Sequence, residues 1–231
     1  MTDALPNRTG QRLGHVVYET LKERLLEGRY DAGSRISIEE LKGEFGVSKQ
    51  PVMDALRRLA TLGIVEIVPQ SGCRVSQYSL LEVRDFFTLF GSFEGEIAAA
   101  AAQRRTDDQL DALDAAWSTI ASLETTADTA VRAHGYRIRN REFHLAIHQM
   151  AHSRVMAELS ARMWDLSDFF INTVGPAQPL ADVVHERNYD HDVIREAIRN
   201  RNDQVAKAAM ERHIVGTIEL ISTTNDQARG A

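Results

Sequence analysis

The amino-acid sequence predicts a mainly α-helical fold in two parts: an N-terminal domain of three helices and a β-hairpin, followed by an all-α antiparallel helical bundle. Two observations predict it. Apolar residues recur at helical spacing along most of the 231 residues, and the one β-type pattern, a short hairpin, ends before residue 78. With 43% apolar and 26% charged residues, the composition is typical of a globular protein with room for two small domains.

The N-terminal domain is expected over residues 1–78. Apolar residues at helical spacing predict its first helix over residues 11–27, and Gly28 follows as a stop signal. A turn-rich segment comes next, after which Ser37 is suited to cap a short second helix over residues 37–45. The pattern therefore predicts two helices joined by a turn.

A third helix and a hairpin complete this domain. Ser48 is suited to cap a helix over residues 48–62, and Pro51 lies in its first turn, where a missing backbone N–H does no harm. Residues 64–76 then read as two short strands around a Pro-Gln-Ser-Gly turn. Three helices followed by such a hairpin, the wing, form a winged helix-turn-helix.

The second domain is expected over residues 79–231, where strand patterns end and helical patterns follow one another. Thr106 and Gln109 have the spacing of a capping box, in which each side chain bonds the other residue's backbone N–H at a helix start. The clearest break is at Gly175-Pro176 and Pro179. The expected helices, which would form an antiparallel bundle, span residues 79–104, 106–123, 128–151, 153–174, 182–200 and 203–223.

Charge is distributed unevenly between the domains. The net charge is −6, but residues 1–78 hold 11 Lys and Arg against 10 Asp and Glu, whereas the remaining residues hold 16 against 23. Contact with nucleic acid therefore fits the N-terminal domain alone. The chain has no run of about 18 apolar residues, no secretory signal pattern and a single cysteine, Cys73. We therefore expect a cytoplasmic protein that neither spans a membrane nor forms an internal disulfide.

The start of the third helix carries a candidate DNA-reading surface. In a helix-turn-helix, the second of the two helices buries one face and presents its N-terminal residues to base edges. Lys49 can donate to guanine and Gln50 can pair with adenine, while Ser48 and the helix N–H groups can hold a phosphate. Arg57 and Arg58 lie further along and could touch the DNA backbone. For each residue alone, a solvated polar face is the competing interpretation.

This region resembles a known family. The stretch VSKQPVMDALRRLATLGIVEIVPQSGCRV is similar to the recognition helix and wing of the GntR superfamily of bacterial regulators, and the matching positions are Val47, Ser48, Pro51, Val52, Ala55 and Leu56. Lys49 and Met53 replace two arginines of the usual pattern, so the operator sequence cannot be taken from relatives. The resemblance implies that the wing residues Gln70, Ser71 and Gly72 approach the minor groove of double-stranded operator DNA.

The C-terminal domain resembles the all-helical effector domain, the FCD domain, of the FadR-type branch. Many members carry Asp-x-x-x-His and two later histidines that together bind a divalent metal. The resemblance implies the same role for Asn140, His144, His191 and His213, of which the first two lie on one helix face. Three imidazoles suit zinc or nickel. Asn140 departs from the pattern, because a neutral amide is a weaker ligand than a carboxylate.

The same resemblance implies a carboxylate effector, which relatives often clamp with an Arg placed four residues before a Glu. Here Phe90 precedes Glu94, so the arginine is missing. Arg137, one turn before Asn140, could supply a replacement positive charge, although a solvent-facing arginine is the competing interpretation. Two further histidines on the stripe of His144 are expected to be surface or packing residues: His148 and His152.

Together these features predict a ligand-responsive transcription regulator, more specifically a repressor, that binds a pseudo-palindromic operator as a homodimer, because one short recognition helix reads too few bases alone. A metal sensor, in which the ion itself is the signal, is one alternative. A metal-dependent hydrolase is another, but the stripe of His144 lacks the HExxH pattern, and no P-loop or nucleophile elbow is present. We therefore expect no enzymatic activity.

Overall fold

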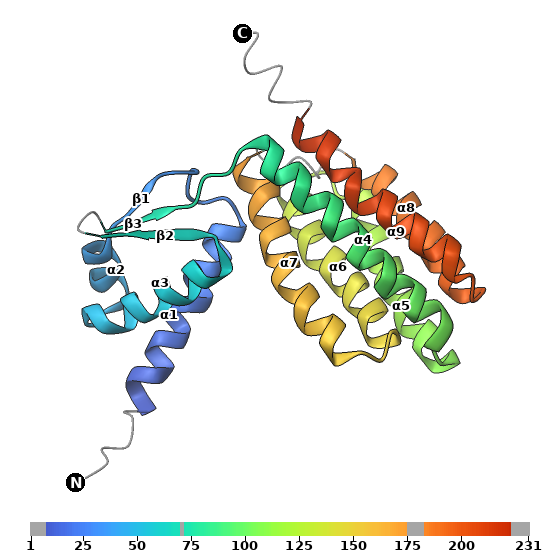
Figure 1. Ribbon diagram of the computed structural model, residues 1–231, viewed down its shortest axis with the longest axis horizontal. Helices are drawn as coiled ribbons and strands as arrows, with labels where there is room; N and C mark the ends of the chain where they lie inside the picture. The colour runs from blue at the N-terminus through green and yellow to red at the C-terminus, as the bar shows by residue number, and fades with distance from the viewer. Residues whose placement is uncertain (1–7, 70–71, 175–182, 223–231) are drawn as a thin grey trace.

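The computed structural model describes residues 8–69, 72–174 and 183–222. Within them, the N-terminal part contains the elements α1 (Arg8–Leu26), β1 (Arg35–Ile36), α2 (Ile38–Phe45), α3 (Lys49–Leu62), β2 (Val65–Val68) and β3 (Gly72–Val75). The C-terminal part contains α4 (Leu80–Arg104), α5 (Asp107–Ala121), a 3₁₀ turn (Ser122–Thr125), α6 (Thr129–Met150), α7 (Arg154–Thr173), α8 (Val184–Arg199) and α9 (Asp203–Val215). Figure 1 shows the two parts side by side, with the sheet and the bundle at opposite ends of the molecule.

The N-terminal part is a winged helix with a third strand. The sheet order is β1-β3-β2, and all neighbouring strands are antiparallel. The hairpin of β2 and β3 was expected, whereas β1 was not, because a two-residue strand is too short to produce an alternating pattern. The core beneath the sheet contains fully buried side chains from α1 and α3, including Leu21, Leu25, Leu56 and Leu59.

The helix caps in this part agree only partly with the sequence analysis. Ser37 caps α2 through its side chain, which accepts a hydrogen bond from the Glu40 backbone N–H at 3.3 Å. Ser48 occupies the N-cap position of α3 with an extended backbone, but its side chain makes no capping hydrogen bond. Its hydroxyl is therefore not committed to the helix end, which agrees with a role in contacting phosphate.

The C-terminal part is a bundle of long helices, as expected. The capping box of Thr106 and Gln109 opens α5. The ends of two helices differ from those expected. The helix expected to reach residue 123 passes into the 3₁₀ turn after Ala121. The helix expected over residues 203–223 ends at Val215, and a further helical segment follows over residues 217–222. The break expected at Gly175-Pro176 and Pro179 lies outside the described residues. In the part of the chain that the structure describes, no helix is both long and apolar enough to cross a membrane.

The helices α4 and α9 pack closely against each other. Gly91 and Gly95 of α4 face α9, and a Cβ atom on Gly95 would lie 2.7 Å from the Cγ atom of Glu211. Such a distance is shorter than carbon atoms tolerate, so a side chain here would displace the Glu211 side chain, and a Cβ atom on Gly91 would lie only 3.2 Å from the Glu211 carbonyl oxygen. The small residues therefore fix the depth at which His213 of α9 lies.

Candidate functional site

The N-terminus of α3 is open to solvent. Ser48, Lys49 and Gln50 are all exposed. Asp54, which the sequence analysis did not single out, accepts hydrogen bonds from Gln50 Nε2 at 2.9 Å and from Arg57 Nη1 at 2.8 Å. This carboxylate therefore holds the two side chains in place on the outer face of α3. The i, i+3 and i, i+4 spacing around Asp54 is the signal that could have revealed it.

The other expected DNA-contacting residues have different environments. The Arg58 guanidinium lies over the Tyr18 ring, 3.5 Å from its centroid, which joins α3 to α1 by a cation–π contact. Gly72 begins β3 with a φ of +100°, a conformation that glycine adopts easily. Gln70 and Ser71 lie outside the described residues. A DNA role for these four residues stays a prediction.

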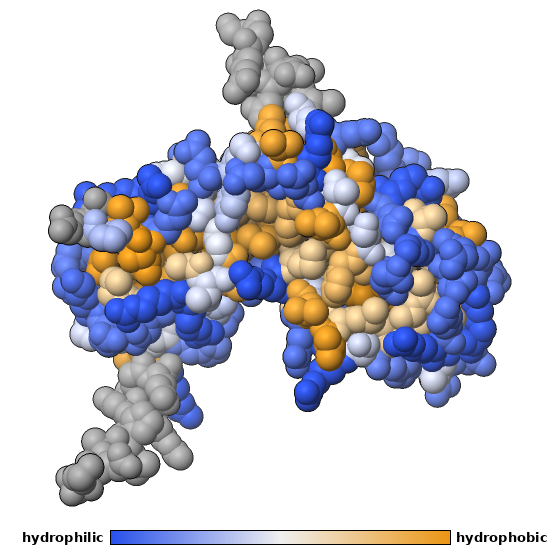
Figure 2. Space-filling view, viewed as in Figure 1, coloured by the Kyte–Doolittle hydropathy of each residue, from blue (hydrophilic) through white to orange (hydrophobic). Residues whose placement is uncertain are grey.

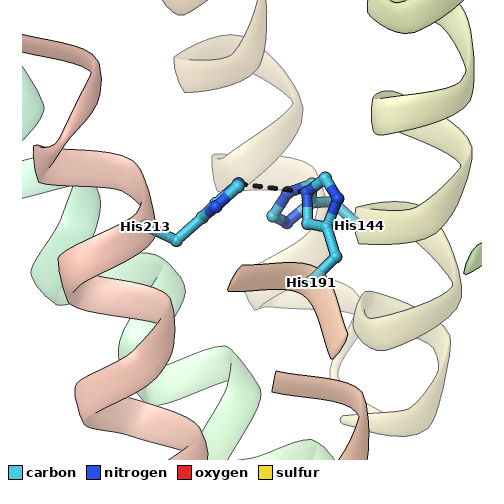
Figure 3. Close-up of side chains that lie close together, drawn as sticks. All are labelled: His144, His191 and His213. Atoms are coloured by element: carbon cyan, nitrogen blue, oxygen red, sulfur yellow. Dashed lines mark hydrogen bonds between the residues drawn. The ribbon is translucent and has the colours of Figure 1, made fainter. Parts of the chain in front are cut away.

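Three histidines meet inside the bundle. His144 of α6, His191 of α8 and His213 of α9 are buried, and each offers one ring nitrogen within 4.8 Å of the other two. Figure 3 shows the three rings pointing toward one another from three different helices, with the Nε2 atoms of His191 and His213 3.1 Å apart. Three neutral nitrogens at this separation could hold a metal ion.

Unpartnered polar atoms surround this histidine triad. Both ring nitrogens of His144, Nδ1 of His191 and the Oδ1 atom of Asn140 are buried without a hydrogen-bond partner among the described residues. Such atoms are costly unless a ligand satisfies them, because each has lost its hydrogen bonds to water. The residues present therefore fit a divalent metal, with Asn140 one helical turn before His144.

The electrostatics of the triad favour the metal-binding form of histidine. Burial holds the pKa values of His144, His191 and His213 well below the usual 6.5, and the positive charge of Arg187 lowers them further. The three rings are consequently neutral at pH 7. Neutral imidazole has the free lone pair that a metal ligand needs.

Beside the triad lies a second buried polar group. Glu94 is fully buried, its Oε2 atom lies 2.9 Å from His148 Nε2, and its Oε1 atom accepts a hydrogen bond from the Ser160 hydroxyl. His148 is therefore a buried partner of Glu94, while His152 is exposed. Glu94 also lies 3.9 Å from His144 Nδ1, so it borders the triad but is already engaged. Periodicity along α6 could not show that a carboxylate of α4 faces His148.

Arg137 points toward the N-terminal part of the chain. Its guanidinium pairs with Glu23 of α1, and it lies 3.7 Å from Glu27 and 3.8 Å from Asp168. The structure thus places Arg137 at the contact between the two parts rather than beside the histidines, and its role as a substitute effector-binding charge stays a prediction. The spacing of Arg137 and Asn140 along α6 could not show which neighbouring helix the longer side chain reaches.

Further charged residues extend this contact into an interdomain ion-pair cluster, whose members are Lys22, Glu23, Arg137, Arg141, Asp165 and Asp168. Asp165 pairs with Lys22 Nζ at 2.5 Å and with both terminal nitrogens of Arg141 at 2.9 Å. Burial raises the pKa of Asp168 to about 6, although Arg141 and Arg137 oppose the shift. The cluster borders a cavity of about 490 Å³ between α1, α6 and α7.

Arg187, which was not expected from the sequence, contacts the triad directly. Arg187 is buried, and its Nη1 atom donates to the His213 carbonyl at 2.6 Å, while Nη2 lies 3.1 Å from His213 Nε2. It precedes His191 by four residues on α8, so the two share a helix face. That spacing is the signal that could have found it.

Comparison with known proteins gives matches over both parts of the chain. Residues 13–75 match the family described as "Bacterial regulatory proteins, gntR family", and residues 85–216 match the family described as "FCD domain". The HTH-type transcriptional repressor GlaR of Escherichia coli K12 is 23% identical over 88% of this chain and 93% of its own length. The HTH-type transcriptional repressor NanR of Cronobacter sakazakii is 25% identical over 92% and 89%.

Solved structures have the same fold. McbR/YncC of Escherichia coli superimposes with a TM-score of 0.73 at 17% identity, covering 92% of this chain and 98% of its own. A structure described as a putative transcriptional regulator GntR, from Rhodococcus sp. RHA1, has a TM-score of 0.70 at 16% identity, with 90% and 96% covered. At such identities, the likeness supports the two-part architecture alone.

Proposed function

This chain belongs to the gntR family of bacterial regulatory proteins and carries an FCD domain, and we propose that it is a repressor controlled by a small ligand. It is a DNA-binding transcription regulator. The alternative of a metal-dependent hydrolase is wrong, because the family and the relatives are regulators rather than enzymes. The names of GlaR and NanR as repressors support repression as the sign of control.

The histidine triad is the observation that carries the ligand-binding part of this proposal. His144, His191 and His213, assisted by Asn140, would hold a divalent ion such as zinc or nickel. All four side chains are neutral, so the bound ion would keep its full charge of +2, whereas an aspartate at position 140 would leave it +1. We infer that the effector is a small carboxylate that binds at open positions of the ion.

The contacts of α6 and α7 suggest how ligand binding reaches the DNA-binding part. The His144 ring packs against Trp164 of α7 with 4.4 Å between ring centroids, and the next residue, Asp165, pairs with Lys22 of α1. Arg141 lies three residues before His144 on α6 and pairs with the same Asp165. A ligand that shifts α6 against α7 would therefore change how α1 packs against the bundle. This requires that the ligand bind one relative position of α6 and α7 more tightly than the other.

Operator release tests the proposed function. Purified protein on fluorescent operator DNA, loaded with zinc, is titrated with a panel of small carboxylates, and anisotropy reports release. We expect one carboxylate to release DNA from the zinc-loaded protein and to lose this effect after chelation. Release by zinc alone would instead make the ion the signal and favour the metal sensor. No release by any carboxylate would contradict control by an organic acid.

Base reading by α3 is the next prediction. Lys49→Ala and Gln50→Ala are each expected to weaken specific operator binding by about 1 to 3 kcal/mol, because each removes a donor to a base edge. Binding to random DNA should weaken less. Lys42→Ala is the matched control, since Lys42 lies on α2 and pairs with Glu39. Equal losses on operator and random DNA would show that Lys49 and Gln50 touch only phosphate.

We expect a homodimer, with α4 and α7 as its interface. Leu81 and Leu89 of α4 and Val155 and Leu159 of α7 each expose more than half of their surface. Figure 2 shows hydrophobic residues gathered over these helices on one face. A second copy of the chain would cover them, since such patches mark interfaces. Sedimentation of the wild-type protein should give a dimer at micromolar concentration. The Leu89→Glu variant should sediment as a monomer. A wild-type monomer that binds one half-site as tightly as the full operator would contradict this expectation.

A further inference from the structure

We propose that Arg187 is the anion-binding residue of the histidine site and that its guanidinium binds the carboxylate group of the effector. This inference rests on the proposed function, because it assigns a residue to the effector that the triad would bind. It also explains why a buried arginine lies among three neutral histidines.

The contacts of Arg187 leave its charge poorly compensated. Only 8% of the residue is exposed, and its close partners are neutral: the His213 carbonyl at 2.6 Å, His213 Nε2 at 3.1 Å and Thr217 Oγ1 at 3.3 Å. Its one ion pair in the described part of the chain is with Asp190 at 3.9 Å, and that carboxylate is shared with His213 Nδ1. A buried guanidinium without a close counterion is costly, so a bound anion would stabilise it.

The unused hydrogen-bonding capacity of the site also supports a bound anion. Arg187 Nε is a buried donor without a partner among the described residues. The buried hydroxyl of Tyr136 lies beside the Arg187 guanidinium, and its own hydrogen has no acceptor among those residues. Burial raises the pKa of Tyr136, so its hydroxyl remains a donor at neutral pH. A carboxylate has two oxygens that can accept hydrogen bonds from a guanidinium fork and a phenol together.

Arg187 and a metal ion would compete for one atom. Nη2 of Arg187 lies 3.1 Å from His213 Nε2, which is also the atom that faces His191 Nε2. One lone pair cannot serve both a donor hydrogen and a metal, and the two cations repel each other. When an ion binds, the guanidinium must therefore turn away from His213. A carboxylate between the ion and Arg187 would attract both cations and weaken the repulsion between them, so ion and anion should bind cooperatively.

A cavity that is lined by Arg187, but by none of the three histidines, offers space for the rest of the effector. It measures about 500 Å³ and lies along α8 and the end of α9, with Glu186, Tyr189 and Arg212 in its lining beside Arg187. Cavities of this size hold small organic ligands. The mixed polar lining suits a molecule with several hydrogen-bonding groups better than a purely apolar chain.

Opposite changes in metal and anion affinity test this assignment. Zinc binding is measured by calorimetry, and acetate binding to the zinc-loaded protein by saturation-transfer NMR. In Arg187→Met, zinc should bind more tightly, because a competing donor and a like charge are gone. Acetate should bind about tenfold more weakly or worse, because charge-assisted hydrogen bonds are lost. Arg187→Lys keeps the charge without the fork, so its acetate affinity should be intermediate.

Arg199→Met is the matched control, because Arg199 lies on the same helix but pairs with Asp114 at the surface. It should leave both affinities unchanged. Equal acetate affinity in wild type and Arg187→Met, or a loss of both zinc and acetate binding in the variant, would overturn the assignment. If the wild type takes up no zinc, the metal part of the proposed function fails by itself; acetate binding to the metal-free proteins then decides the role of Arg187 by the same comparison.

Discussion

His191→Ala is expected to lower the affinity for zinc by roughly 100-fold or more. Residues that merely orient metal ligands already contribute about 10- to 100-fold, so removal of a ligand should cost at least as much. His191 is fully buried and its Nε2 atom lies 3.1 Å from His213 Nε2, so its loss removes one of the three imidazole ligands from inside the site. Competition with a chelator of known affinity measures the change.

Thermal unfolding gives a second readout of the same variant. Zinc at 100 times its dissociation constant should stabilise the wild-type protein by about 2.7 kcal/mol, because only the folded state presents the complete site. This stabilisation should vanish in His191→Ala and persist in His152→Ala, whose histidine is exposed and outside the triad. A wild-type protein that gains no stability from zinc or nickel would show that the triad is only a packed histidine cluster.

Asp168→Asn is expected to stabilise the protein at pH 8 by about 1 to 3 kcal/mol. Burial raises the pKa of Asp168 from 3.8 to about 6, so the folded protein binds this proton more tightly than the unfolded chain. The free energy of unfolding therefore falls as the pH rises from about 4 to 6, and above pH 6 the folded state carries the full cost of a buried carboxylate. The asparagine removes that cost, and its advantage should shrink at pH 5.

Asp165→Asn is the matched comparison on the same helix. Asp165 is close to Lys22 and Arg141, so its neutralisation should destabilise the protein at pH 8, opposite in sign to Asp168→Asn. Urea unfolding followed by circular dichroism at pH 5 and pH 8 measures both variants. A destabilised Asp168→Asn at pH 8 would mean that its contacts with Arg137 and Arg141 outweigh the cost of burial.

Local patterns in the sequence were sufficient for the architecture. The stop at Gly28, the cap at Ser37 and the capping box at Thr106 depend on residues within a few positions, so these three helix boundaries were predictable to within a few residues. The recognition helix and the FCD domain were identified by resemblance, which the family matches confirm. The same resemblance named the three histidines that the structure brings together.

Tertiary structure alone decided which side chains meet across helices. Periodicity reveals the face of a helix on which a residue lies, but it says nothing about the helix that packs against that face. The pairing of Glu94 with His148, the reach of Arg137 to Glu23 and the position of Arg187 beside His213 all join residues that are 26 or more positions apart. Side chains of such length can turn to either of two neighbouring helices, and only the packed bundle selects between them.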